Sequence, residues 1–317
     1  MNPNEYNNTN KILSLLFIIV PTILLIAGYF YFPTSPDDNV KSLIQIPIFL
    51  GLILLLIGFL TTKYSFGKIF KTFGWIIFAF YWSTQPYSLY INEGRDIFNG
   101  FICVIGVYIL FYLAYHEWLS YLRKENISSL NWIVGASAIA GLIYFGVERS
   151  FLSTSLIYEV ARESAWILDL IIGKVTLGPA GIISTPILYD GTVIVSIIFA
   201  CTAVQSMVIF VGMILALPEV NIKRKIIGLL VTVLPVYILN LFRNALVAFL
   251  LVRNITDFNL AHNVIAKIGS LIALVVLLLI IIKIIPEVFD KILSLTNIYK
   301  RNGPLEKIFN NLIRRKS

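Results

Sequence analysis

The chain has 317 residues, of which 58% are hydrophobic and 13% charged, and its mean hydropathy is +0.86. This composition excludes an ordinary soluble or disordered protein and indicates a helical protein that crosses a membrane several times. The net charge of +8 would suit a nucleic-acid partner in a soluble domain, but most Lys and Arg lie in short loops, where they set membrane orientation, so we expect no nucleic-acid partner.

Apolar runs near 20 residues predict an all-α, polytopic membrane protein with about eight transmembrane helices. We place these helices at about 12–32, 43–61, 73–91, 98–117, 131–147, 194–217, 226–250 and 264–285. Basic loops at 63–71, 123–124 and 223–225 and the basic tail alternate with more acidic loops, so both termini are expected in the cytoplasm. We expect no cleavable signal peptide, because the first apolar run leads into a loop containing Pro and Asp.

The segment 148–192 is expected on the outer side, within a single catalytic membrane domain over 1–285. Its first half predicts an amphipathic helix at the outer interface or against the bundle. The polar face would carry Glu159, Arg162, Glu163, Trp166 and Asp169, and the apolar face Leu156, Val160, Ile167 and Ile171. The Gly- and Pro-containing stretch that follows would line a site. Residues 286–317 predict a basic, amphipathic cytoplasmic tail on the anionic inner leaflet.

Three reactive side chains fall near the outer ends of three different predicted helices: Cys201, Arg243 and His262. A thiol, a cation and an imidazole at one depth are the parts of a cysteine nucleophile site, because a cation favours the thiolate and an imidazole exchanges protons. Cys103 and Cys201 lie in separate apolar segments without Cys-x-x-Cys spacing, so neither a disulfide nor a metal site is indicated, and no cofactor is expected. Cys103 is interpreted as a packing residue.

Each of these residues also has a structural interpretation. Arg243 near the interface could extend its guanidinium to water, and a cysteine in an apolar helix is most often a small buried hydrophobe. His262 could be a loop or cap residue, in which case Asn263 could take its role. The other histidine, His116, lies among interfacial aromatics at the cytoplasmic end, which predicts a wetted surface position. Four polar neighbours are candidates for supporting the site: Asn240, Asn244, Gln205 and Asn263.

The motifs ACTAVQS around Cys201, NLFRN around Arg243 and AHNVIAK around His262 resemble the exosortase/archaeosortase family of membrane transpeptidases. The resemblance covers most of residues 130–285 and the first four helices only loosely. Many bacterial members have Cys-Ser-Gly where this chain has Cys-Thr-Ala, so the archaeal branch is more similar. In family members the third position is His or Arg, commonly further from the Arg than His262 is from Arg243.

The resemblance implies that Cys201 attacks a peptide bond, that Arg243 stabilises the thiolate or the oxyanion, and that His262 transfers a proton. It also implies substrates that are surface proteins with a C-terminal sorting signal, often of the Pro-Gly-Phe type, and a membrane lipid as acceptor. The site would face outside the cell membrane. We expect an opening wide enough for an extended peptide, walled in part by the Gly- and Pro-containing segment before Cys201.

Two other functions compete with this one: a polytopic transporter and a surface-polysaccharide export component. Polar residues within a membrane often line a translocation path. Acidic residues are nearly absent from the predicted helices, however, and the polar group lies at one surface with no paired broken helices. These features favour the enzyme.

Overall fold

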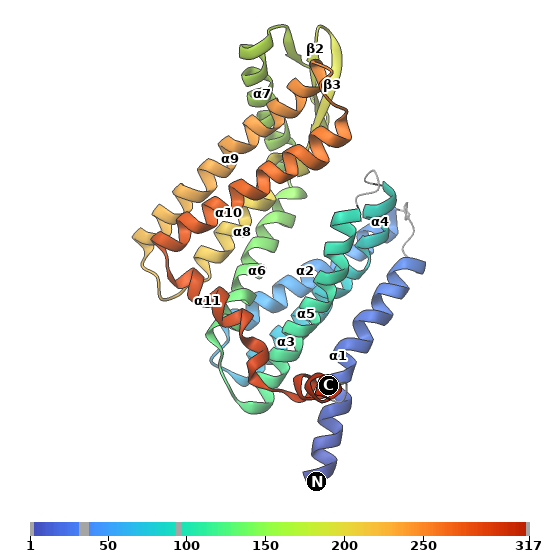
Figure 1. Cartoon of the computed structure of the whole chain (residues 1–317), viewed down its shortest axis with the longest axis vertical. Helices are drawn as coiled ribbons and strands as arrows, with labels where there is room; N and C mark the ends of the chain where they lie inside the picture. The colour runs from blue at the N-terminus through green and yellow to red at the C-terminus, as the bar shows by residue number, and fades with distance from the viewer. Residues whose placement is uncertain (1–2, 32–37, 93–96, 315–317) are drawn as a thin grey trace. The chain divides into compact units, whose positions relative to one another are not determined.

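A computed structural model describes residues 3–31, 38–92 and 97–314 and is dominated by helices (Figure 1). The first part of the chain forms α1 (Pro3–Tyr31), α2 (Asp38–Leu60), α3 (Ser65–Ser83), α4 (Gln85–Asn92), α5 (Ile97–Arg123), α6 (Ser128–Glu148) and α7 (Phe151–Ile172). Three strands follow: β1 (Val175–Leu177), β2 (Ser184–Tyr189) and β3 (Thr192–Ile198). The remainder comprises η1 (Phe199–Thr202), α8 (Val204–Leu215), α9 (Ile222–Val252), η2 (Asn259–Ala266), α10 (Lys267–Ile284), α11 (Glu287–Thr296), η3 (Ile298–Arg301) and α12 (Pro304–Arg314).

Six described helical segments are long and apolar enough to cross a membrane, compared with the eight expected. They are Ser14–Tyr31, Leu43–Leu60, Asn99–Arg123, Ser128–Glu148, Ile222–Val252 and Asn259–Ile284. The run expected as a helix at 73–91 is divided between α3 and α4. The run expected at 194–217 begins as strand β3, passes through η1, and becomes helical only in α8. Hydropathy does not distinguish an apolar strand from half of a membrane helix, whereas the β-branched residues of β3 favour a strand.

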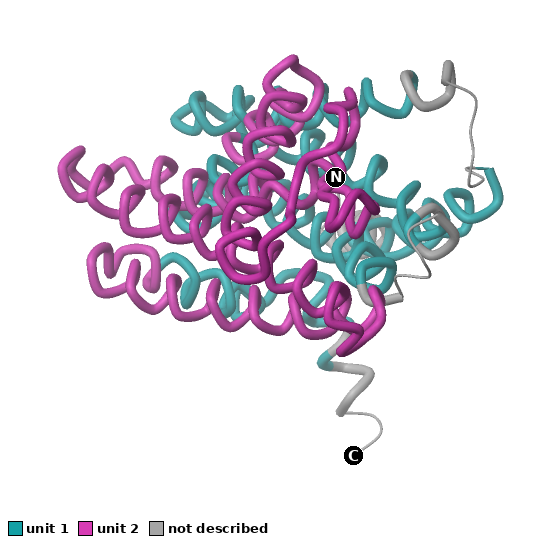
Figure 2. Tube along the Cα trace, turned by 90° about the horizontal axis from the view of Figure 1, so that it is seen from above, with its two compact units in different colours: residues 1–138, 291–317 teal, residues 139–290 magenta. Residues whose placement is uncertain are grey.

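The described chain groups into two compact units, coloured separately in Figure 2, which we describe one at a time. Unit 1 comprises residues 1–138 and 291–317, and unit 2 comprises 139–290. The candidate residues Cys201, Arg243 and His262 all lie in unit 2. Residues 291–314, expected as part of a tail after residue 285, belong to unit 1 in this grouping, and the division into one catalytic domain and a tail stays a prediction.

In unit 1, α3 packs against both α2 and α5, and its buried face includes two basic residues. Lys68 and Lys71, expected in a cytoplasmic loop, lie within α3, and Lys71 is 2% exposed. The Lys71 Nζ donates to Thr62 Oγ1 at 2.8 Å and lies 3.8 Å from Glu117 Oε2. Burial lowers the pKa of Lys71, and the Glu117 carboxylate opposes this shift. These two lysines are therefore not loop charges that report orientation.

His116 also differs from its expected position, because it is fully buried rather than wetted. Its Nε2 lies 3.3 Å from Glu306 Oε1 of α12, and its Nδ1 lies 3.1 Å from Arg301 Nη1. Tyr112 and Tyr115 donate hydrogen bonds to the two oxygens of Glu306, at 2.8 and 3.1 Å. The last helix of the tail is thus fixed to α5 by a buried polar cluster, which hydropathy alone did not indicate.

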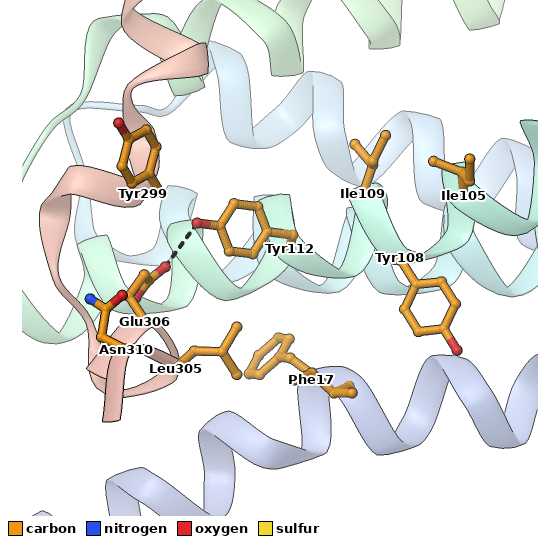
Figure 3. A pocket seen from close by; sticks show the side chains of 10 residues that line it. Phe17, Ile105, Tyr108, Ile109, Tyr112, Tyr299, Leu305, Glu306 and Asn310 are labelled. Carbon is orange, nitrogen blue, oxygen red and sulfur yellow. Dashed lines mark hydrogen bonds between the residues drawn. The ribbon is translucent and has the colours of Figure 1, made fainter. Parts of the chain in front are cut away.

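A cavity in unit 1 adjoins this cluster (Figure 3). Its volume is about 600 Å³. Phe17, Tyr108 and Tyr112 are among its lining residues, with Glu306 at the α12 side. None of the three candidate catalytic residues lines it.

Unit 2 is organised around α9, against which α7, α8 and α10 pack. The helix expected after residue 148 is α7, and it lies against the bundle. Its buried face contains Ile157, Val160, Ala161, Ser164 and Leu168, so the expected apolar face was only partly correct. Ile171, expected on that face, is exposed, because the helix packs through small residues that hydropathy underweights.

The Gly- and Pro-containing stretch forms an antiparallel sheet in the order β1-β2-β3, which packs against α7. The sheet was not anticipated. A bulge lies between Ile187 and Leu188 in the pairing of β2 with β3, and Gly191, with φ +82°, closes the turn between these strands. Because β3 continues directly into η1, this small sheet determines where Cys201 lies.

Candidate active site

Cys201 lies in the short turn η1, between the end of β3 and the start of α8. It is a free, buried cysteine with 8% exposure. Thr202 Oγ1 donates to the Phe199 carbonyl at 2.7 Å and closes the turn. The next residue, Ala203, has φ +59°, a left-handed conformation that favours glycine. The thiol is therefore held on a sharp bend rather than along a continuous membrane helix.

Two asparagines of α9 fix the backbone of Cys201. Asn240 and Asn244 donate to its carbonyl oxygen through Nδ2, at 2.7 and 3.1 Å. Both are buried, and their spacing of four residues places them on one face of α9. These amides were expected to support the site through contacts with Arg243. The structure instead assigns them to the backbone of the candidate nucleophile.

Arg243 lies on α9 directly before Asn244 and three residues after Asn240. Its Nε is buried and has no hydrogen-bond partner among the described residues. A buried donor without a partner costs about 1–3 kcal/mol, so such a group is expected where it serves a ligand or a reaction. This donor lies between Asn240 and Asn244 in the sequence of α9, on the part of the helix that holds the Cys201 backbone, and a guanidinium there can bind an oxyanion that forms during attack on a carbonyl.

His262 lies in the π-helical segment η2, which continues into α10. Its ring stacks on Phe258, with ring centroids 5.1 Å apart and an angle of 8° between the planes. The segment packs against α9 through Ala261 and Ala266, which contact Val247, one helical turn after Arg243. π-helical turns are rare in proteins, and those that occur are frequently found at functional sites. Participation of His262 in proton transfer with Cys201 stays a prediction.

The remaining two candidates lie near this group in the chain. Asn263 donates to Asn259 Oδ1 at 2.7 Å, so its amide is bound within η2. Gln205 is exposed in the first turn of α8, four residues after Cys201. The structure brings together Cys201, Arg243, Asn240 and Asn244, and it leaves the roles of Gln205 and Asn263 as predictions.

One link in this unit was not anticipated from sequence. Tyr237, three residues before Asn240, donates to Glu163 Oε2 of α7 at 2.7 Å. Glu163 had been placed on the polar face of an amphipathic helix at the outer interface or against the bundle, and nothing indicated a partner in α9. The available signal was the tyrosine at 237 within an otherwise apolar helix, because its hydroxyl needs a polar partner such as the carboxylate of Glu163 on α7. The bond ties α7 to α9 less than two turns from Arg243.

The chain is similar to Archaeosortase A of Haloferax volcanii, with 24% identity over 195 residues. The match covers 57% of this chain and 62% of the relative, so the chain spans about three-fifths of the length of that curated relative. No family model matches the chain, and no solved structure matches it. The similarity supports an archaeosortase-like relationship.

Proposed function

We propose that this protein is a membrane-embedded cysteine transpeptidase that cleaves C-terminal sorting signals of surface proteins at the outer face of the cell membrane and transfers them to a lipid. The observation that carries the proposal is the buried Nε of Arg243, which has no hydrogen-bond partner among the described residues and lies on the part of α9 whose Asn240 and Asn244 hold the backbone of Cys201. The similarity to Archaeosortase A supports the same class of activity. Six candidate membrane-crossing helices fit a multi-pass protein.

In the proposed reaction, the Cys201 Sγ attacks the carbonyl carbon of the scissile peptide bond, and His262 accepts the thiol proton. Arg243 stabilises the negative charge that develops on the carbonyl oxygen. When the C–N bond breaks, His262 returns the proton to the leaving amine, and a thioester to Cys201 remains. A nucleophilic group of the lipid acceptor then attacks the thioester and gives its proton to His262. The C–S bond breaks, and the departing Cys201 sulfur takes that proton back from His262 to restore the thiol.

The substitution Cys201→Ala tests the proposal directly. The assay co-expresses the protein with a reporter that ends in the C-terminal segment of a surface protein encoded in the same genome. We expect Cys201→Ala to abolish shortening of the reporter, because the nucleophile is removed with little change in volume. Mass spectrometry of the mature C-terminus then distinguishes a lipid adduct from simple hydrolysis.

Cys103→Ala is the matched control, because Cys103 is also a buried cysteine outside any disulfide but lies in α5 of unit 1. This variant should process the reporter at close to the normal rate. If Cys201→Ala also processes it normally, the cysteine mechanism is wrong.

A further inference from the structure

The strand that leads to Cys201 is at the edge of its sheet. In the order β1-β2-β3, β3 has one strand neighbour, and no further strand of the described chain pairs with it. An open strand edge can hydrogen-bond an extended peptide as an additional strand. Since Ile198 ends β3 and Cys201 lies in the turn that follows, a peptide on this edge would run toward the thiol.

The register identifies which backbone groups of β3 face the open edge. Pro186 of β2 has no N–H, and its carbonyl accepts from the Gly178 N–H next to β1, at 2.9 Å. The carbonyl group of Pro186 therefore faces away from β3. Ser196 pairs with Pro186, and opposite residues in an antiparallel ladder either bond each other or both point away. The N–H and C=O of Ser196 thus face the open edge, and those of Ile198, two residues on, do the same.

A cavity of about 360 Å³ lies at the start of the same strand. Thr192, Val193 and Ile194 line it from β3, Tyr189 lines it from the end of β2, and Leu251, Val252 and Phe258 line it from the region where α9 ends. The cavity therefore lies at the turn end of the β2–β3 hairpin, where an extended peptide along β3 would begin. The Phe258 ring also stacks on His262, which connects this cavity to the candidate acid/base.

We propose that the polypeptide substrate binds as an extended strand along the open edge of β3, in the same direction as β3, with a large apolar side chain in the cavity of Val193, Leu251 and Phe258. This inference rests on the proposed transpeptidase function. The parallel direction is part of the proposal: the bound chain passes the cavity at the start of β3 first and Cys201 second, and the phenylalanine scan tests this order. At about 3.3 Å per residue, the apolar side chain lies about five to seven residues before the scissile bond.

The test uses eight-residue peptides that end in a chloromethyl ketone. The Cys201 Sγ displaces chloride from such a probe and forms a thioether, with the thiol proton released as HCl. The protein is the full chain in Cys103→Ala form, so that Cys201 is the remaining thiol. One probe series carries a single phenylalanine at each position in turn among alanines, and iodoacetamide serves as a small probe that needs no peptide site.

Two substitutions address the two parts of the proposal. Ser196→Pro removes an N–H that faces the open edge without removing a bond to β2, and Val193→Trp fills the cavity. Each should slow alkylation by the best phenylalanine probe about tenfold, roughly the effect of one lost hydrogen bond or contact, while alkylation by iodoacetamide stays unchanged. The best phenylalanine position should lie five to seven residues before the ketone.

The controls place the same changes elsewhere in the sheet region. Leu177→Pro introduces proline on β1, the opposite edge, and Ile183→Trp introduces tryptophan at an exposed position outside the cavity. Equal rates for the test and control variants, or no preference among phenylalanine positions, would overturn the strand-binding proposal while leaving the function intact. If a folded protein instead processes the reporter after Cys201→Ala, the proposed function itself fails. If a test variant also slows alkylation by iodoacetamide, its substitution has disturbed the turn that carries Cys201. The phenylalanine scan on the protein with unsubstituted β3 then decides whether the peptide binds along this edge.

Discussion

Arg243 shows what a single buried cation requires in an apolar helix. Charged residues within membrane helices are costly, so they normally pair or face a polar site. Here the neighbouring amides of Asn240 and Asn244 donate to the Cys201 carbonyl, and the N–H of Arg243 Nε has no hydrogen-bond partner among the described residues. The asparagines therefore bind the backbone of Cys201, and the Nε of Arg243 is not used by them, which fits the proposed role of Arg243 in binding the oxyanion.

Arg243→Lys separates charge from geometry. Lysine keeps the positive charge but loses the planar fork of donors. If Arg243 binds the oxyanion, reporter processing should fall by about 10²–10³-fold, the scale for loss of one oxyanion donor. The measurement is the initial rate of reporter shortening at equal amounts of membrane protein. A rate near that of the unsubstituted protein would leave Arg243 a point charge or a structural residue.

Sequence alone selected Cys201, Arg243 and His262 as candidates, because Cys, Arg and His are conspicuous among apolar neighbours. It did not identify what each would contact. Asn240 and Asn244 were predicted to support the site, and the structure shows that they bind the backbone of a turn that was expected to be a helix. His116 shows the opposite failure, since a position among aromatics at a helix end indicated a wetted residue, whereas a distant tail segment buries it.

At the level of elements, the main departure is the conversion of an expected membrane helix into β3, η1 and α8. The bend at Ala203 explains why the thiol is presented at a turn, because a left-handed residue cannot continue a helix. The resemblance gives this position as glycine in many bacterial family members, which is the residue best suited to such a backbone. Local hydropathy carries no information on φ, so the bend was not predictable from the apolar run.

The bonds from α9 to η1 predict a joint loss of stability and activity. Asn240→Leu removes the shorter of the two hydrogen bonds to the Cys201 carbonyl, at 2.7 Å, and Asn244→Leu the longer, at 3.1 Å. Each change should lower the free energy of unfolding by about 1 kcal/mol, and the first should cost more. Processing should fall too, because the turn that carries the thiol is less well fixed. Thermal melting in detergent and the reporter assay measure the two effects.

Leu239→Ala is the control on the same helix, since Leu239 is exposed on the outside of unit 2. It should leave processing unchanged. If the variant with both Asn240→Leu and Asn244→Leu has the melting temperature and the processing rate of the unsubstituted protein, these bonds do not position Cys201.

At the scale of the whole molecule, the C-terminal tail contributes to the structure of unit 1. Hydrophobic patterning correctly indicated amphipathic helices after Pro286, but an interface with lipid and an interface with protein require the same pattern. What distinguishes them is the cluster of Glu306 with Tyr112, Tyr115 and His116, which joins residues nearly 200 positions apart. Such long-range pairing leaves no local trace in the sequence.

This cluster predicts that docking of α12 depends on pH. Burial alone would raise the pKa of Glu306, but hydrogen bonds from His116 and Tyr112 lower it to about 2, against 4.5 for a free carboxyl. A carboxyl whose pKa is depressed on docking contributes stability above about pH 4.5 and loses it as the pH falls toward 2. Hydrogen exchange of residues 304–314, corrected with an unstructured reference peptide, should therefore show protection that declines over this range.

Glu306→Gln supplies the decisive comparison. The amide cannot ionise, so protection of α12 should be weaker at neutral pH and nearly independent of pH between 5 and 2. Asp190→Asn, which changes an exposed carboxylate in unit 2, should leave the pH dependence of α12 as it is. If Glu306→Gln retains the full acid-dependent loss of protection, another group controls the docking of the tail, and the Glu306 carboxylate is not what holds α12 against α5.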